Sequence, residues 1–229
     1  MKQLVLDLSR PPAPTLENFA PGSNAEALAV LRAWLAETLE ERCVYLCGPS
    51  GCGKSHLVRA LAQALQEAGR SVAQVGADDL EALESGAMLP SVVAIDDIQR
   101  LSAAGQAALF RLFHRLRDDD VRLLVAADVP PARLALRDDV RTRLGAGLVL
   151  QLRLLSDEEK VEALRNHAAG RGFSLLPEMS DYLLRHGRRD LPSLLAVLDA
   201  LDQYSLQTKR QITLPLLREV LQRAQGAQT

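Results

Sequence analysis

Eight consecutive residues have the types and spacing needed to bind phosphate. The run Gly48-Pro49-Ser50-Gly51-Cys52-Gly53-Lys54-Ser55 matches the pattern G-x-x-x-x-G-K-[ST] at every fixed position. Its glycines let the backbone turn tightly, so that successive N–H groups face phosphate oxygens. Lys54 would reach the β- and γ-phosphates, and the Ser55 hydroxyl would ligate Mg²⁺. The pattern therefore predicts a nucleotide site.

Carboxylates follow two apolar runs further along the chain. Asp96 and Asp97 come directly after residues 92–95, and Asp128 follows residues 124–127. An enzyme with such a loop needs one acid to orient the Mg²⁺ shell and another to polarise the attacking water. We assign these roles to Asp96 and Asp97, although an acidic pair after a strand is also a common loop start. Asp128 is expected beside the γ-phosphate.

Arginines form two further candidate groups. Arg137, Arg141 and Arg143 lie within residues 136–144. They are either a solvated helix face with local Arg–Asp pairs or the source of an arginine that reaches a neighbouring molecule's γ-phosphate. Arg189 precedes a helix near the C-terminus, where it either reaches the phosphates or is ordinary surface charge.

The elements around the loop alternate between strands and helices. An apolar run at 42–47 precedes the loop and a helical pattern at 55–68 follows it. Further strands are predicted at 71–75, 92–95, 121–126 and 148–152, and helices at 24–39, 78–83 and 103–116, the first capped by Ser23 or Asn24. This alternation predicts an α/β fold with a parallel sheet covered on both faces.

The pattern changes after residue 154. Four amphipathic helices are predicted at 157–169, 178–186, 191–204 and 214–224, and Ser156 with Glu159 forms a capping box for the first. Residues 1–24 read as an extended, proline-rich leader. We expect three parts: a peptide and tether at 1–14, an α/β nucleotide-binding core at 15–154, and a small all-helical unit at 155–229.

Composition narrows the class of protein. The 229 residues carry a net charge of -2 and a pI of about 6.1, which argues against strong binding to duplex DNA by the chain alone. No transmembrane run or secretory signal is evident, and three cysteines without a C-x-x-C pair fit a reducing cytoplasm. Cys52 is either an acidified thiol or, as we favour, a small residue that fits the loop.

Several segments together resemble the AAA+ ATPase core of the bacterial replication initiator DnaA. They are Asn18-Phe19, Gly22-Ser23-Asn24, Gly53-Lys54-Ser55-His56-Leu57, Ile95-Asp96-Asp97-Ile98-Gln99, Asp128-Val129-Pro130-Pro131 and Arg141-Thr142-Arg143-Leu144-Gly145. The resemblance implies an AAA+ fold with a helical lid, and binding of ATP or ADP with Mg²⁺. It implies that Arg143 is an arginine finger, that Arg189 senses nucleotide from the lid, and that the stretch around Asn18 and Phe19 contacts adenine. The resemblance also implies that His56, which directly follows the phosphate loop, belongs to the nucleotide-binding residues.

The ends of the chain depart from the initiator's pattern. No helix-turn-helix DNA-binding domain follows the lid, and the N-terminus reads Gln3-Leu4-Val5-Leu6-Asp7-Leu8. This segment looks like the peptide with which replication proteins dock on the sliding clamp, with Gln3, Leu4, Leu6 and Leu8 as the docking side chains. An edge strand with the three leucines on one face is the alternative.

With these departures, the whole chain is similar to the Hda family of DnaA-related regulators. That resemblance implies that a clamp-bound, ADP-loaded form promotes ATP hydrolysis on DnaA through Arg143 in trans, and so negatively regulates replication initiation. Its own ATPase activity would be weak or absent. The implied partners are DnaA and the sliding clamp, and DNA would be contacted only through the clamp complex. We expect no membrane partner, and the protein could form a homo-oligomer. The alternatives are a helicase loader with its own turnover and an adaptor for another DnaA-like protein.

Overall fold

The computed structural model describes residues 13–84, 88–118 and 120–226, and these form two compact units, divided between Leu154 and Leu155. The segment that carries Gln3, Leu4, Leu6 and Leu8 lies outside the described residues. Each unit is described by itself. None of the described helices combines the length and the apolar character that crossing a membrane requires.

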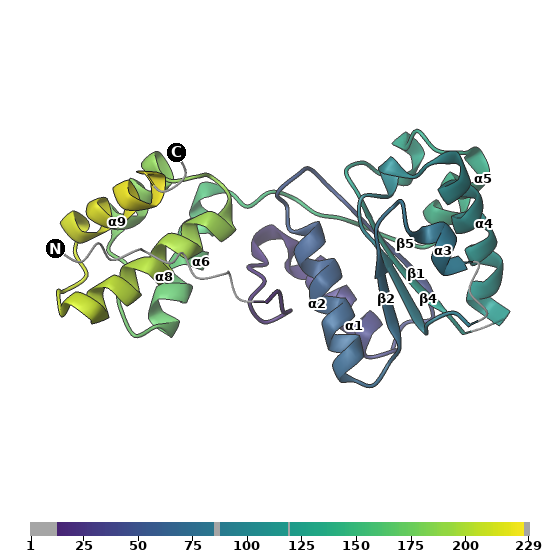
Figure 1. Cartoon of the computed structure of the whole chain (residues 1–229), viewed down its shortest axis with the longest axis horizontal. Coiled ribbons are helices and arrows are strands. Elements are labelled where there is room, and N and C mark those ends of the chain that lie inside the picture. The colour runs from purple at the N-terminus through teal and green to yellow at the C-terminus, as the bar shows by residue number, and fades with distance from the viewer. Residues whose placement is uncertain (1–12, 85–87, 119, 227–229) are drawn as a thin grey trace. The chain divides into compact units, whose positions relative to one another are not determined.

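A five-stranded parallel sheet forms the centre of the first unit (Figure 1). Its strands lie in the order β2-β3-β4-β1-β5, and each hydrogen-bonds to its neighbour in parallel. The strands are β1 Cys43–Cys47, β2 Val72–Val75, β3 Val92–Ile95, β4 Arg122–Ala127 and β5 Leu148–Gln151. Every residue of β1 and β3 is buried, as expected for a parallel sheet that is covered on both faces.

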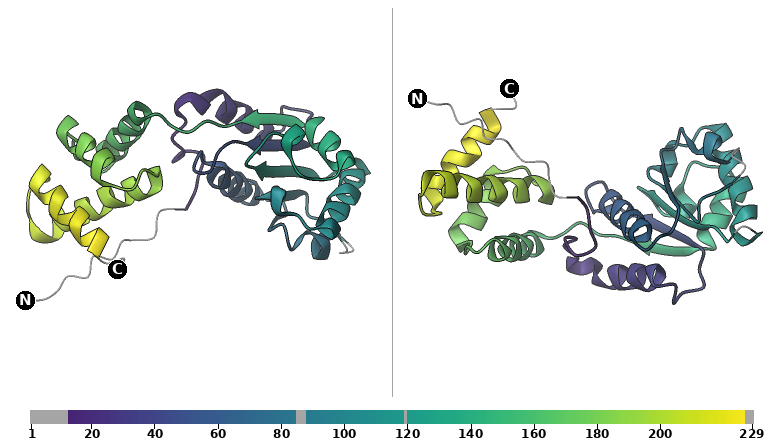
Figure 2. Two further views of the ribbon diagram at one scale, coloured as in Figure 1. Left: turned by 90° about the horizontal axis from the view of Figure 1, so that it is seen from above. Right: turned by 60° about the horizontal axis from the view of Figure 1, so that its bottom comes forward.

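Alternate side chains of β1 enter two separate hydrophobic clusters. Val44 and Leu46 pack with helices α1 (Ala25–Leu35) and α2 (Lys54–Glu67). Tyr45 and Cys47 pack with α3 (Leu80–Glu84), α4 (Ala103–Asp118) and α5 (Asp138–Gly145). Figure 2 shows these two groups of helices on opposite faces of the sheet. Because all the strands run in one direction, all their carboxyl ends lie at one edge.

The second unit is entirely helical among its described residues. Its helices are α6 Asp157–Gly170, α7 Pro177–His186, α8 Leu191–Thr208 and α9 Leu214–Gly226. They share one hydrophobic cluster of their own. The predicted capping box is present, because Ser156 accepts a hydrogen bond from the Glu159 N–H while the Glu159 carboxylate accepts one from the Ser156 N–H. The predicted α/β core followed by an all-helical unit is confirmed.

Three local predictions about the N-terminal region were wrong. The described part of the predicted leader is not an extended tether, because Leu16 and Phe19 are buried against α1 and α2. Asn24 precedes α1 but its side chain makes no capping bond, since it pairs with the backbone of Arg153 instead. Helix α1 also ends at Leu35 rather than Leu39, because Glu37 adopts a left-handed conformation with φ of 57°.

Candidate nucleotide-binding site

The glycine-rich loop leaves the carboxyl end of β1 and enters α2 with the geometry that a phosphate loop needs. Gly51 and Gly53 have φ of 84° and 98°, which glycine adopts without strain, and Gly53 is the N-cap of α2. A Cβ atom on Gly53 would lie 2.6 Å from the Phe19 ring, and one on Gly48 would lie 2.4 Å from the Leu152 carbonyl oxygen. Glycine is therefore required at these positions for packing as well as for backbone shape.

Lys54 is a buried cation inside this loop. Its ammonium group donates to the carbonyl oxygens of Gly48 at 2.8 Å and Pro49 at 3.2 Å. It also forms an ion pair with Asp128 at 3.1 Å, although the Asp128 side chain is half exposed. Register places these groups together, because Cys47 at the end of β1 pairs with Ala127 at the end of β4. Phosphate oxygens could replace these three acceptors.

The carboxylates after β3 belong to the same polar cluster. The Gln99 side-chain amide donates to Asp97 at 3.0 Å and to Asp128 at 3.2 Å, so it bridges the ends of β3 and β4. Asp97 has φ of 54°, and its N–H donates to the Asp96 carboxylate. The sequence prediction gave Gln99 no role, although its motif was recognised. Its other amide atom, Oε1, is buried without a hydrogen-bond partner among the described residues.

The predicted metal ligands, Ser55 and Asp96, lie at the start of α2 and just after β3. Among the described residues, no group of three or more His, Cys, Asp or Glu side chains is arranged to hold a metal ion. The hydroxyl of Ser55 and the carboxylate of Asp96 are oxygen donors that fit Mg²⁺, which commonly takes one or two protein ligands and completes its shell with phosphate oxygens and water.

Residues 13–24 form one wall beside the loop. Phe19 is buried, its ring centroid lies 5.5 Å from that of His56, and His56 Nε2 contacts the Thr15 carbonyl oxygen at 2.9 Å. Burial lowers the pKa of His56 below its ordinary value. Asn18 is exposed and organises the turn, because its side chain accepts from the Thr15 N–H and donates to the Ala13 carbonyl oxygen.

Two residues near the loop were missed by sequence reasoning. Asn24 is 3% exposed and makes two hydrogen bonds to the backbone of Arg153, so it fastens the N-terminal wall to the chain that leaves β5. Leu154 is 53% exposed, and its side chain would lie 3.7 Å from a Cβ on Gly51. An exposed leucine therefore lies beside the phosphate loop.

Cys52 packs within the loop and is buried. Burial raises the pKa of its thiol, although the nearby Lys54 acts in the opposite direction. The prediction that Cys52 is a small residue that fits the loop is favoured over an acidified thiol.

Arg143 lies on α5, outside the Lys54–Asp128 cluster. Its guanidinium carbon lies 4.7 Å from the centre of the Phe110 ring, and its Nη2 lies 3.4 Å from His114 Nε2, both on α4. Arg137 pairs with Asp139, and Arg141 pairs with Asp138. Among the described residues Arg143 has no carboxylate partner, which distinguishes it from Arg137 and Arg141.

Arg189 belongs to the helical unit and is exposed. It precedes Asp190, whose carboxylate caps α8 by accepting the Ser193 N–H. The neighbouring Arg188 pairs with Asp190.

A parallel sheet of this strand order, with a glycine-rich loop after β1 and a helical unit after β5, defines an AAA+ protein. The chain belongs to the family of bacterial DnaA ATPase domains, whose model matches residues 12–151, and the model of the Hda lid domain matches residues 157–221.

Solved structures share this fold at low sequence identity. Domain III of the Thermotoga maritima replication initiation protein DnaA is 21% identical with a TM-score of 0.73, and the match covers 92% of this chain and 96% of that one. AMPPCP-bound DnaA from Aquifex aeolicus is 23% identical with a TM-score of 0.70, covering 82% of this chain and 65% of that one. The Thermotoga maritima RuvB Holliday junction branch migration motor is 19% identical with a TM-score of 0.63, and the match covers 86% of this chain and 67% of that one. The chain therefore spans about two thirds of the longer relatives.

Proposed function

We propose that the protein is a nucleotide-binding regulator of DnaA. ATP or ADP would bind at residues 48–55, with its phosphates against the loop N–H groups and Lys54. Mg²⁺ would bridge the phosphates to Ser55 and Asp96 and neutralise their charge. Phe19, with Asn18 holding its turn, would form the wall beside the adenine. The buried Lys54 and its exchangeable partners support this site.

The regulatory step would use Arg143 in trans. A guanidinium placed at the γ-phosphate of a partner's ATP stabilises the charge that develops during phosphoryl transfer. Arg143 is available for this step because it rests on an aromatic ring, with no carboxylate partner among the described residues. This availability is the observation on which the proposal chiefly depends. We infer that the partner is ATP-loaded DnaA, since both family models that match the chain belong to DnaA-related proteins.

The sliding clamp would deliver the protein to DnaA. The proposed docking side chains are Gln3, Leu4, Leu6 and Leu8, on an extended segment that places apolar groups in a pocket. Hydrolysis of DnaA-bound ATP would then lower the amount of active initiator. The chain's own turnover is expected to be weak, and Asp97 is the residue that would polarise water for it.

The decisive experiment measures ATP hydrolysis by ATP-loaded DnaA in the presence of clamp loaded on DNA, with and without this protein. We expect acceleration that is lost in Arg143→Ala and on deletion of residues 1–9. Removal of an arginine finger typically costs about 10³-fold or more. Arg141→Ala is the matched control, because Arg141 lies on the same helix and pairs with Asp138.

Each result separates this proposal from its alternatives. Equal acceleration by wild type and Arg143→Ala would contradict the role of Arg143 in trans. Absence of any acceleration, together with ATP turnover by the isolated protein that single-stranded DNA stimulates, would favour a helicase loader.

A further inference from the structure

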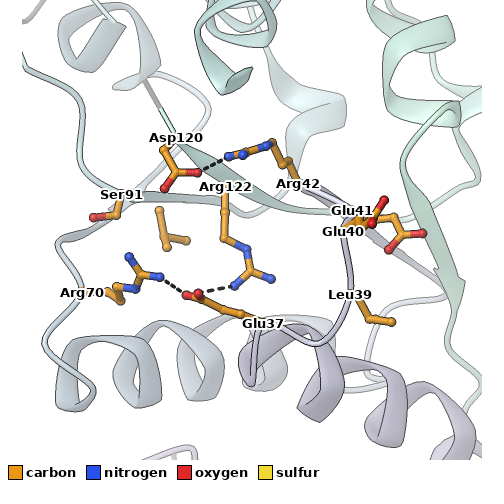
Figure 3. A pocket seen from close by; sticks show the side chains of 10 residues that line it. Glu37, Leu39, Glu40, Glu41, Arg42, Arg70, Ser91, Asp120 and Arg122 are labelled. Atoms are coloured by element: carbon orange, nitrogen blue, oxygen red, sulfur yellow. Dashed lines mark hydrogen bonds and ion pairs between the residues drawn. The ribbon is translucent and has the colours of Figure 1, made fainter. Parts of the chain in front are cut away.

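A small cavity lies at the edge of the sheet opposite the phosphate loop, where the strands begin. Its volume is about 200 Å³. Arg42 precedes β1, Ser91 precedes β3 and Arg122 opens β4, so three strand starts contribute to its lining (Figure 3). Arg70, which precedes β2, completes the basic part of the lining.

Arg122 is the most buried of the three cavity arginines. Its side chain is 11% exposed, and its guanidinium carbon lies 3.8 Å from the centre of the Trp34 ring. Its Nη2 donates to the Trp34 carbonyl oxygen, but its Nη1 is buried with no hydrogen-bond partner among the described residues. The nearest carboxylate oxygen, on Glu37, is 3.8 Å from Nη1. A buried charged donor that makes an ion pair but no hydrogen bond is unusual in native proteins.

The positive charges of Arg42 and Arg70 affect the pKa of Arg122. Burial lowers the pKa of Arg122, and the charges of Arg70 and Arg42 add to this effect, while Glu37 and Asp120 oppose it. The side chains of Arg42 and Arg70 are each 39% exposed, so their donors are accessible from solvent. Three guanidinium groups therefore share one small space with the carboxylates of Glu37 and Asp120, which form ion pairs with them, and Glu40 and Glu41 add two further carboxylates to the lining.

Two carboxylates partly occupy this space, and both come from unfavourable backbone conformations. Glu37 and Asp120 have φ of 57° and 54°, in the left-handed region that disfavours residues with a Cβ. Glu37 pairs with Arg70, and Asp120 pairs with Arg42. Their side chains are 47% and 78% exposed, so either can turn out to solvent. These carboxylates stand where the oxygens of an anionic ligand would lie.

We propose that this cavity binds a small phosphoryl anion, at a site separate from the nucleotide site. Arginine forks match the several oxygens of a phosphate group better than a single cation does. The volume is below the 300–1,000 Å³ typical of pockets for drug-sized ligands, so it suits one or two phosphate groups. Glu40 and Glu41 also line the cavity and are exposed, which disfavours an extended polyanion such as nucleic acid.

The test is calorimetric titration of the full chain with inorganic phosphate, carried out with and without saturating ADP and Mg²⁺. Filling the phosphate loop with ADP should leave one phosphate site per chain. We expect Arg70→Gln to weaken that site about tenfold or more, because a charge-assisted bond is lost. We expect Glu37→Gln to strengthen it, because the competing carboxylate is removed. Arg32→Gln removes an exposed arginine of α1 that does not line the cavity, and should change nothing.

The opposite signs of the two substitutions distinguish a binding site from a purely structural ion-pair cluster. The proposal is overturned if neither wild type nor Glu37→Gln shows saturable binding, or if Arg70→Gln binds phosphate as wild type does. Failure of ADP to bind would count against the nucleotide site but not against the cavity site. The effect of Arg70→Gln on phosphate binding can still be measured in the absence of ADP. If pyrophosphate or phosphate binds more tightly than glycerol phosphate, the natural ligand is a free ion. If glycerol phosphate binds more tightly, the natural ligand is a phosphorylated metabolite.

Discussion

At the scale of single residues, the charge of Lys54 dominates the phosphate loop. Its side chain is 7% exposed, and its three acceptors are two loop carbonyl oxygens and the Asp128 carboxylate. Desolvating an ammonium group is costly unless such partners surround it. Because two partners are carbonyl groups of the loop itself, the ammonium stays in the loop and could exchange its partners for phosphate oxygens.

Replacement of Asp128 tests this exchange. Asp128→Asn removes the anionic partner of Lys54, and we expect the free energy of unfolding of the ADP-free protein to fall by about 1 kcal/mol. With saturating ADP and Mg²⁺ the loss should shrink, because phosphate would then neutralise Lys54. Urea unfolding of both forms measures the difference. Asp138→Asn, in the exposed pair with Arg141, should cost less than about 0.5 kcal/mol in either form. A loss that ADP does not reduce would count against the exchange.

His56 makes the wall beside the loop sensitive to acid. Burial lowers the pKa of His56 below its ordinary value of 6.5. As pH falls, the unfolded chain takes up the proton first, so this contribution to stability is complete above about pH 6.5 and decreases below it. We expect the wild type to lose stability faster than His56→Gln between about pH 7 and pH 5, by at most about 1.4 kcal/mol per pH unit. Parallel thermal unfolding curves for the two proteins over that range would contradict the prediction.

At the scale of elements, local patterns identified the strands and helices of both units. The strands at 92–95 and 148–152, for example, were placed within one residue of β3 and β5, because apolar runs bounded by polar residues fix them. Helix ends were less exact. Helix α8 continues to Thr208, four residues beyond the prediction, since Lys209 is the residue that turns left-handed.

Contacts between distant parts of the chain could not be read from the sequence. The sequence around Asn24 predicts a helix cap, yet the Asn24 side chain hydrogen-bonds to the backbone of Arg153, which is 129 residues away in the sequence. The loop and its acids were predictable because motif spacing and the parallel sheet bring them to one edge. The stacking of Arg122 on Trp34 and of Arg143 on Phe110 depends on tertiary packing, which leaves no pattern in a single sequence.

A carboxylate of α9 adds polar contacts to the hydrophobic packing of α8 against α9. Glu219 accepts a hydrogen bond from Tyr204 at 2.8 Å and one from Arg210 at 2.8 Å. These bonds lower the pKa of Glu219, so its contribution is complete above its ordinary value of 4.5 and is lost as pH falls through the lowered value. We expect Glu219→Gln to destabilise the helical unit by about 1 kcal/mol at pH 7. Urea unfolding should show this loss narrowing below about pH 4, whereas Glu178→Gln, exposed on α7, should have little effect at any pH.

At the scale of the whole molecule, the chain consists of two units that each have a hydrophobic cluster of their own. Such units can in principle fold independently. From the resemblance to DnaA we propose that Arg189 of the helical unit also contributes to nucleotide binding.

Arg189→Ala tests this role without touching the loop. Arg189 is exposed and Asp190, not Arg189, caps α8, so the helical unit should keep its stability. We expect the dissociation constant for ADP to rise about tenfold, the effect of one lost charge-assisted bond to phosphate, while the melting temperature of the nucleotide-free protein stays unchanged. Arg185→Ala, which removes another exposed arginine of the same unit, is the control and should bind ADP as wild type does. Equal ADP affinity in Arg189→Ala would mean that the α/β unit alone holds the nucleotide, and the helical unit would then have to contribute through contacts with DnaA instead.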